Sequence, residues 1–134
     1  MSAADPRTDA VIVACAISAG IHAALAPEHF RETTAAGVGF VASAVLLAAL
    51  AVVLTRRPSD AAFGATVLVF AGLIGSYVLA LTTGIPGVHP DVDAVESLAV
   101  ATKAVEAAGL VLAALGLRLA PLHLNLTNPK GTLS

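Results

Sequence analysis

Three ionisable residues interrupt an otherwise apolar stretch, 94–117, near the end of the chain. Glu96 and Lys103 are seven residues apart and Glu106 follows three residues later, so a helix places all three within about 80° of its surface. A lone charge at the middle of a membrane costs about 2.5–3.5 kcal/mol on insertion scales. Pairing of Lys103 with Glu106 lowers that cost, because each supplies the counter-charge of the other. The spacing predicts a functional polar pocket, and a structural clamp or a Lys103 that reaches the outer interface are the alternatives.

Four polar residues of the first apolar stretch recur at spacings of three, four and seven: Cys15, Ser18, His22 and His29. They share one face if the helix continues through Pro27. A polar face is costly against lipid, so we expect this face to point into a bundle of helices. His22 is then either a packing residue bonded to a neighbouring helix, or a ligand or proton acceptor.

Polar groups of the third apolar stretch lie at a similar expected depth. Ser76, Tyr77 and Thr83 fall in the half of that stretch that we expect to face outward. Three of the four apolar stretches thus bring polar groups to one level, which predicts a polar cavity open toward the outside. Its expected residues are His22, Ser76, Tyr77, Thr83, Lys103 and Glu106.

A divalent metal site is an alternative use of the outer loops. His29 and Glu32 are three residues apart, which on a helix lets both reach one ion, and Glu28 is adjacent. His89 can approach from the other outer loop. Imidazole and carboxylate ligands suit zinc, or iron in a two-His arrangement. Carboxylates beside histidine on an aqueous loop are usually only solvated. The sequence therefore does not identify a cofactor, and a divalent metal is one possibility.

The composition indicates which elements position these residues. The chain has 134 residues, of which 57% are hydrophobic and only 12% charged, whereas a soluble domain is about a quarter charged. A net charge of -2 with seven Lys and Arg excludes a nucleic-acid-binding module, and one cysteine excludes a disulfide framework. The remaining class is an integral membrane protein.

Four apolar stretches of about 20 residues each are long enough to cross a bilayer as helices. We therefore predict an all-α fold, a single transmembrane domain over 1–134 that forms a four-helix bundle. Asp5 and Pro6 favour an early start of the first helix, and Ser59 or Asp60 a cap for the third. The expected spans are 8–26, 35–55, 61–83 and 94–117.

The distribution of Lys and Arg predicts the orientation. Five of these residues fall on the side of the two termini, and only Arg31 falls on the other side. Because cytoplasmic loops are enriched in Lys and Arg, both termini and the turn at 56–60 are predicted to be cytoplasmic. The expected location is the bacterial cytoplasmic membrane, crossed several times. The five residues are Arg7, Arg56, Arg57, Arg118 and Lys130.

Three segments together resemble a known group: GIHAALAPEHF at 20–30, YVLALTTGIPG at 77–87 and VATKAVE at 100–106. They are similar to small, uncharacterised four-span membrane proteins of high-GC Gram-positive bacteria, over nearly the whole chain. The resemblance implies the four-span architecture and a bacterial origin. It implies no activity and no catalytic residue.

Three functions fit these observations. The first is a non-enzymatic membrane protein whose outward-opening pocket binds or passes a small ligand or ion. The second is an accessory subunit of a larger membrane complex or a homo-oligomer, since small residues four apart, such as Ala44 and Ala48, favour close helix packing. The third is an intramembrane acid–base enzyme, although no nucleophile and base stand at a recognisable spacing. The bilayer is the expected partner of all three, and nucleic acid of none.

Overall fold

Four helices make up the computed structural model, which describes residues 5–88 and 96–123, with side chains as far as Leu117. The helices are α1 (Pro6–Glu32), α2 (Thr34–Arg56), α3 (Asp60–Thr82) and α4 (Ser97–His123). Each is long and apolar enough to cross a membrane. The prediction of an all-helical protein with four candidate membrane spans is confirmed.

Helix α1 begins where the sequence predicted and ends later. The Asp5 carboxylate accepts a hydrogen bond from the backbone N–H of Arg7 at 3.2 Å, and Pro6 occupies the first turn. The helix continues through Pro27 to Glu32, beyond the expected end at residue 26. A proline leaves the carbonyl four residues earlier, here that of Ala23, without its helical donor. Both residues are exposed, so this position tolerates the loss.

Single residues cap the connections between helices. The Thr33 backbone N–H donates to the carbonyl of His29 at 3.0 Å, and the Thr33 hydroxyl accepts from the N–H of Ala36 at 3.1 Å. Thr33 alone therefore ends α1 and begins α2. Ser59 caps α3 in the same way through the N–H of Ala62, at 3.2 Å, as its position in the turn predicted.

Helix α4 starts later than expected and extends further. It runs from Ser97 to His123, whereas the sequence predicted 94–117. Lys103 is therefore about 9 Å along the helix from its first residue, rather than the 13 Å that a start at residue 94 gives. The ammonium group lies closer to the end of the bundle than the sequence indicated.

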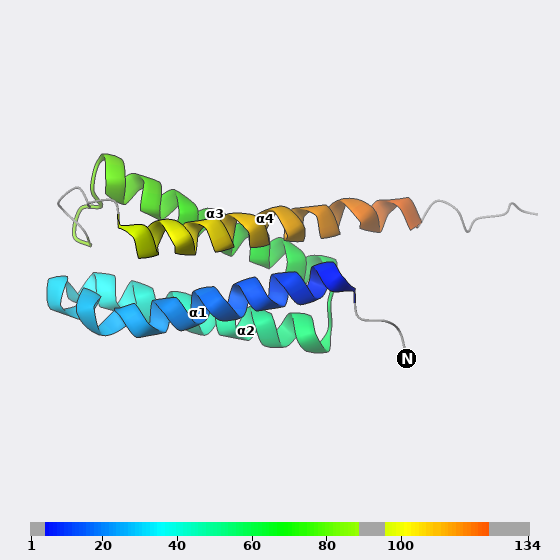
Figure 1. Cartoon of the computed structure of the whole chain (residues 1–134), viewed down its shortest axis with the longest axis horizontal. Helices are drawn as coiled ribbons and strands as arrows, with labels where there is room; N and C mark the ends of the chain where they lie inside the picture. The colour runs from blue at the N-terminus through cyan, green and yellow to red at the C-terminus, as the bar shows by residue number, and fades with distance from the viewer. Residues whose placement is uncertain (1–4, 89–95, 124–134) are drawn as a thin grey trace, which may run out of the picture.

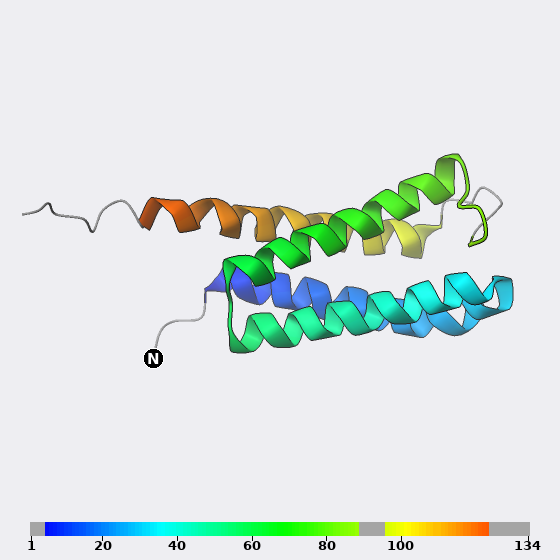
Figure 2. The ribbon, with the colours of Figure 1, turned by 180° about the vertical axis from the view of Figure 1, so that it is seen from behind.

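The helices form two antiparallel hairpins, α1 with α2 and α3 with α4 (Figure 1). Helix α1 also packs against α4, whereas α2 and α3 touch least. One end of the molecule holds the start of α1, the turn at 57–59 and the end of α4, and we call it the Arg57 end. The opposite end, with Thr33 and the turn at 83–88, is the Thr33 end. Helix α3 separates from α2 toward the Thr33 end (Figure 2).

The apolar core fills the half of the bundle nearer the Arg57 end. Phe70 of α3 is fully buried there, against Gly109 of α4. A Cβ atom on Gly109 would lie 2.6 Å from the Phe70 ring and 2.9 Å from the Ala14 Cβ, so α4 can approach α1 and α3 this closely only with glycine at position 109. Buried residues of the same core are Val11, Cys15, Leu47, Leu50, Leu54 and Ala113.

Candidate functional site

A cavity of about 500 Å³ occupies the half of the bundle nearer the Thr33 end. All four helices and the turn at 83–88 contribute to its wall. Apolar side chains such as Leu25, Leu73 and Ile85 supply part of the lining. The polar or titratable residues of the lining are His22, Glu28, His29, Glu32, Ser43, Ser76, Tyr77, Glu96, Thr102 and Lys103.

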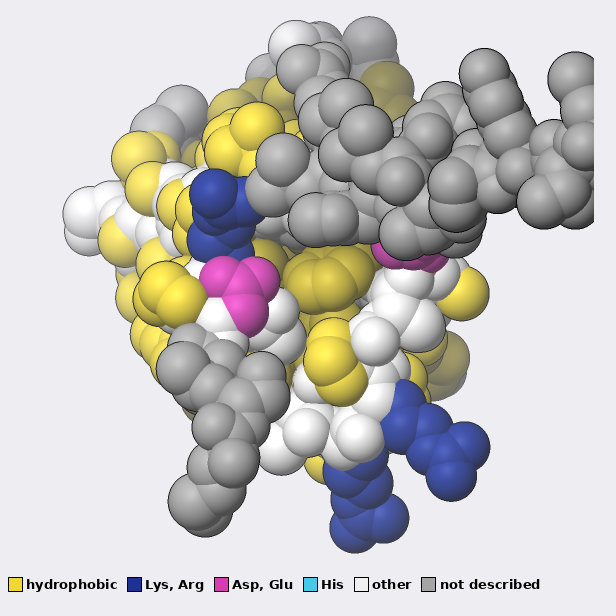
Figure 3. Space-filling view, turned by 90° about the vertical axis from the view of Figure 1, so that its right-hand side faces the viewer, with side chains coloured by type: hydrophobic (Ala, Val, Ile, Leu, Met, Phe, Trp, Pro, Cys, Tyr) yellow, Lys and Arg dark blue, Asp and Glu magenta, His cyan; other side chains and the backbone are white. Residues whose placement is uncertain are grey.

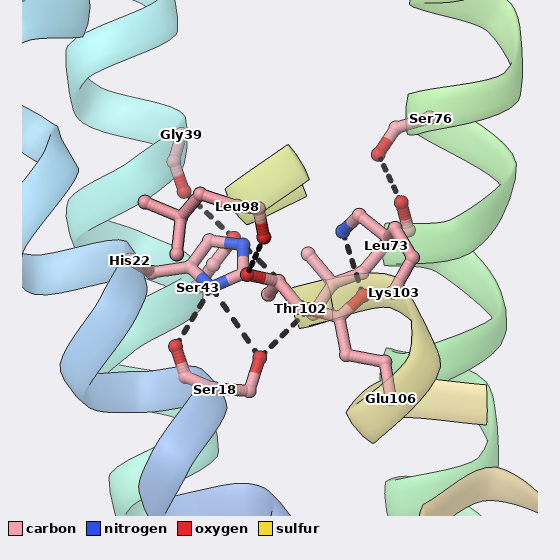
Figure 4. A network of polar contacts seen from close by, with 10 residues as sticks. All are labelled: Ser18, His22, Gly39, Ser43, Leu73, Ser76, Leu98, Thr102, Lys103 and Glu106. Carbon is pink, nitrogen blue, oxygen red and sulfur yellow. Dashed lines mark hydrogen bonds and ion pairs between the residues drawn. The ribbon is translucent and has the colours of Figure 1, made fainter. Parts of the chain in front are cut away.

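The inner end of the cavity rests on a buried carboxylate. Glu106 of α4 has no exposed surface, and both of its oxygens are engaged (Figure 4). The Ser18 hydroxyl of α1 donates to Oε1 at 2.7 Å, and the Lys103 ammonium donates to Oε2 at 2.6 Å. Lys103 keeps 18% of its side-chain surface exposed and lines the cavity, whereas Glu106 lies beneath it. The pair thus separates the cavity from the apolar core.

His22 stands beside this pair with a defined tautomer. Its Nδ1 lies 2.8 Å from the backbone carbonyl of Ser18, and a carbonyl only accepts, so Nδ1 carries the hydrogen. Nε2 is 4.0 Å from Glu106 Oε1, which is too long for a hydrogen bond. In the neutral ring Nε2 is therefore an acceptor at the edge of the cavity. Phe40 of α2 holds the ring from the other side, with 5.2 Å between ring centroids.

The rim of the cavity at the Thr33 end is acidic and aromatic. Glu28, Glu32 and Glu96 line it, and Glu28 forms an exposed ion pair with Arg31 at 2.8 Å. His29 stacks on Phe40 with 3.6 Å between ring centroids. The Thr33 hydroxyl donates to the Val88 carbonyl at 2.8 Å, which ties the turn at 83–88 to the connection between α1 and α2.

Three of the four residues predicted to bind a metal lie at the rim of the cavity. The structure brings Glu28, His29 and Glu32 to one edge of the cavity. Within residues 5–88 and 96–123 it shows no group of three His, Cys, Asp or Glu side chains able to hold an ion. His89, the fourth predicted ligand, lies outside the described residues. The metal site stays a prediction.

Of the six residues predicted for the pocket, four line one cavity: His22, Ser76, Tyr77 and Lys103. Glu106 lies directly behind Lys103. Thr83 is not part of the lining, because its hydroxyl turns back to the carbonyls of Leu79 and Gly84 at 3.3 and 3.0 Å. Placing Thr83 on the same face as Ser76 did not account for this local bonding.

Tyr77 has one unusual feature. Its ring lies 5.6 Å from the Lys103 nitrogen, within the range of a cation–π contact. Its hydroxyl is buried and makes no hydrogen bond with any residue that the structure describes. A buried donor without a partner costs about 1–3 kcal/mol.

Two residues of the site were missed from the sequence. Ser18 was recognised on the polar stripe but not as the second partner of Glu106. The signal was available, because Ser18 lies one helical turn before His22 on the face expected to point inward. Phe40, which packs on both His22 and His29, gave no comparable signal, since one aromatic residue in an apolar span is unremarkable in sequence.

No family model, curated protein or solved structure matches the chain. The resemblance to four-span proteins of high-GC Gram-positive bacteria therefore stays a prediction. The geometry of the cavity is the basis for the function that follows.

Proposed function

We propose that this protein is a non-enzymatic membrane protein whose cavity binds a small ligand or ion. The observation that carries the proposal is the cavity of about 500 Å³ that ends on the Lys103–Glu106 pair. A charged pair inside a membrane bundle is costly, and ionisable residues in that position generally mark a functional path or pocket. Here the pair leaves the Lys103 ammonium in contact with an open space.

Binding suits the geometry better than passage through the membrane. Beyond Glu106 toward the Arg57 end, the space between the helices is filled by the apolar core around Phe70 and Leu47, both without exposed surface. An ion leaving the cavity in that direction would have to cross this core without polar partners. Catalysis is also disfavoured, because the Ser18 hydroxyl that donates to Glu106 is completely buried and does not line the cavity.

The cavity opens to the outside in this proposal. Arg7, Arg56 and Arg57 are exposed at the Arg57 end, the face of the molecule on which Figure 3 shows dark-blue side chains. Arg31 is the corresponding cation at the Thr33 end. Because cytoplasmic segments are enriched in Lys and Arg, this distribution supports a cytoplasmic Arg57 end in a bacterial cell.

A thermal-shift experiment tests the binding function. The single cysteine, Cys15, is completely buried, so a fluorogenic thiol reagent reports unfolding of the detergent-solubilised protein. Alkylamines, carboxylates and Zn²⁺ are added in turn. A ligand that binds the folded state at 100 times its Kd stabilises it by about 2.7 kcal/mol. We expect at least one class to raise Tm in the parent and in Arg56→Gln, and not in Lys103→Met/Glu106→Gln.

Arg56→Gln is the matched control, because it removes an exposed charge far from the cavity. If no class raises Tm, or if the double variant keeps the shift, the binding function is wrong. A native mass that exceeds the chain would then support the accessory subunit or the homo-oligomer.

Cysteine labelling tests the orientation separately. In a Cys15→Ala background, a membrane-impermeant thiol reagent added to intact cells should modify Glu32→Cys and spare Ser59→Cys. Both positions are exposed at opposite ends of the bundle. Labelling of position 59 alone would reverse the orientation.

A further inference from the structure

The wall of the cavity is weakest between α2 and α3. These two helices touch least of all neighbouring pairs, and α3 moves away from α2 toward the Thr33 end (Figure 2). Gly39 of α2 and Ser76 of α3 each line the cavity and are each exposed on the surface. A Cβ atom added at Gly39 would meet no atom within 4 Å. We infer that the cavity has a side opening between α2 and α3, which we call the window. The small residues Gly39 and Ser76 lie on its two sides.

The other walls are closed by side chains. Between α1 and α2, the Phe30 ring occupies the space beside Gly37, and Phe40 packs on His22. Between α1 and α4, the Ser18–Glu106 hydrogen bond closes the inner end of the cavity. The opening is placed between α2 and α3 because these two helices touch least, whereas side chains of α1 and α2 fill the space between that pair.

The surroundings of the window are those of a lipid-facing surface. Leu46 of α2 lies seven residues after Gly39 on the same face and is 48% exposed, and Leu79 of α3 lies one turn after Ser76 and is 52% exposed. In a membrane these side chains contact acyl chains, because both helices are apolar along their length. A molecule that uses the window is therefore one that dissolves in the bilayer.

Lys103 determines the polar chemistry of such a molecule. It is the only Lys or Arg among the described residues of the lining, and an ammonium group has three donors and no acceptor. One donor is directed to Glu106. The Lys103 nitrogen contacts the ring of Tyr77, so it lies on the α3 side of the cavity. Tyr77 directly follows Ser76 in the chain. The group that binds there must carry hydrogen-bond-accepting oxygens.

The aqueous rim favours the same route. Glu28, Glu32 and Glu96 line the cavity at the Thr33 end and outnumber Arg31, which pairs with Glu28, so this rim disfavours an anion that approaches from water. An anionic or carbonyl-bearing molecule that arrives from the bilayer through the window does not cross this rim. A soluble anion that enters from water would have to cross the rim.

We propose that the cavity takes an amphipathic molecule from the outer leaflet through the window between α2 and α3. Its acceptor oxygens bind the Lys103 ammonium, and its apolar part lies between Gly39 and Ser76. This inference rests on the proposed binding function and adds the ligand class and the route of entry. The shared chemistry is an oxygen acceptor on an apolar chain, either a carboxylate or an uncharged carbonyl.

The chain itself supplies the reporter for a test. It contains one Tyr and no Trp, and the ring of that residue, Tyr77, lines the cavity. Bromine atoms quench Tyr fluorescence on contact. The protein is placed in vesicles of unbrominated phosphatidylcholine, and four probes are titrated: 9,10-dibromostearate, its methyl ester, a dibromoalkane of equal length and bromoacetate.

We expect saturable quenching by the carboxylate, the ester or both, and only weak, non-saturating quenching by the alkane and by bromoacetate. Quenching by the ester as well as the carboxylate would show that an uncharged carbonyl suffices. Gly39→Phe and Ser76→Phe, which fill the window from opposite sides, should reduce quenching to the level of the alkane, and so should Lys103→Met. Gly20→Phe is the matched control, since Gly20 is exposed on α1, has open space around it and does not line the cavity.

Absence of saturable quenching in the parent would overturn the inference, as would its persistence in both window variants. The proposed binding function has a separate readout, the Tm shift with soluble ligands. It stands if that shift still depends on Lys103 and Glu106.

Discussion

The two halves of the bundle are built on opposite principles, although the same four helices run through both. Toward the Arg57 end, small residues such as Gly109 let the helices close on Phe70, which has no exposed surface. Toward the Thr33 end, glycine is also present, but Gly39 has no atom near its missing side chain, and a cavity opens. Gly109 therefore permits close packing around Phe70, whereas Gly39 borders the cavity. The Lys103–Glu106 pair lies at the boundary between them.

The largest expected effect concerns that boundary. Glu106→Gln leaves Lys103 without its counter-charge, and breaking a buried pair costs about 3–5 kcal/mol of stability. The double variant Lys103→Met/Glu106→Gln should recover most of the loss, because no charge then stays unpaired. Thermal unfolding followed with the thiol reagent at Cys15 measures both. If Glu106→Gln leaves the stability unchanged, water in the cavity solvates Lys103 and the pair is not a boundary.

Two phenylalanines compare the packing of the halves directly. Phe70→Ala leaves a hole in a filled core and should lower the free energy of unfolding by about 3 kcal/mol, near the lower end for such changes because lipid is as apolar as the core. Phe40→Ala enlarges an existing cavity and removes two ring contacts, at a cost of about 1 kcal/mol. Equal losses in the two unfolding curves would remove the distinction between the halves.

Two glycines provide the reverse comparison. Gly109→Ala forces a methyl group against the Phe70 ring and should cost about 1–3 kcal/mol. Gly39→Ala meets open space and should raise stability by up to about 1 kcal/mol, since alanine is the better helix former. The Tm difference between the two variants is the quantity to measure. Opposite signs support the comparison, and a loss at position 39 contradicts it.

The smallest expected effect is at Tyr77. Removal of its buried hydroxyl, which has no partner among the described residues, should raise the free energy of unfolding by about 1 kcal/mol. Tyr77→Phe keeps the ring that contacts Lys103. If Tyr77→Phe is instead less stable than the parent in the same unfolding assay, the hydroxyl has a partner that the described residues do not supply.

Much of this architecture could be predicted from composition and spacing. Four apolar stretches bounded by caps such as Asp5 and Ser59 predict four helices, because a bilayer fixes their length and leaves few other solutions. The depth of the polar residues followed from the same argument, which is why His22 and Lys103 were expected in one region. The predicted end of the first helix was less accurate. The helix continues past Pro27, because the Ala23 carbonyl that loses its helical donor is in an exposed residue.

The detail of the site depended on packing that periodicity does not encode. Thr83 shares a helix face with Ser76, yet its hydroxyl bonds locally to Leu79 and Gly84. Ser18 binds Glu106 because α1 and α4 touch at that level, and nothing in either segment alone specifies this contact. The window at Gly39 depends on the angle between α2 and α3, which the sequence pattern does not determine.

The most direct test of the central claim compares two positions on one helix. Ser43 and Leu50 are seven residues apart on α2, so they face the same way, but Ser43 lines the cavity and Leu50 lies in the core. Each is replaced by cysteine in a Cys15→Ala background, and a small, charged methanethiosulfonate is added from outside. The two-halves account predicts rapid modification at position 43 and none at position 50. Protection of both, or equal modification of both, would contradict it.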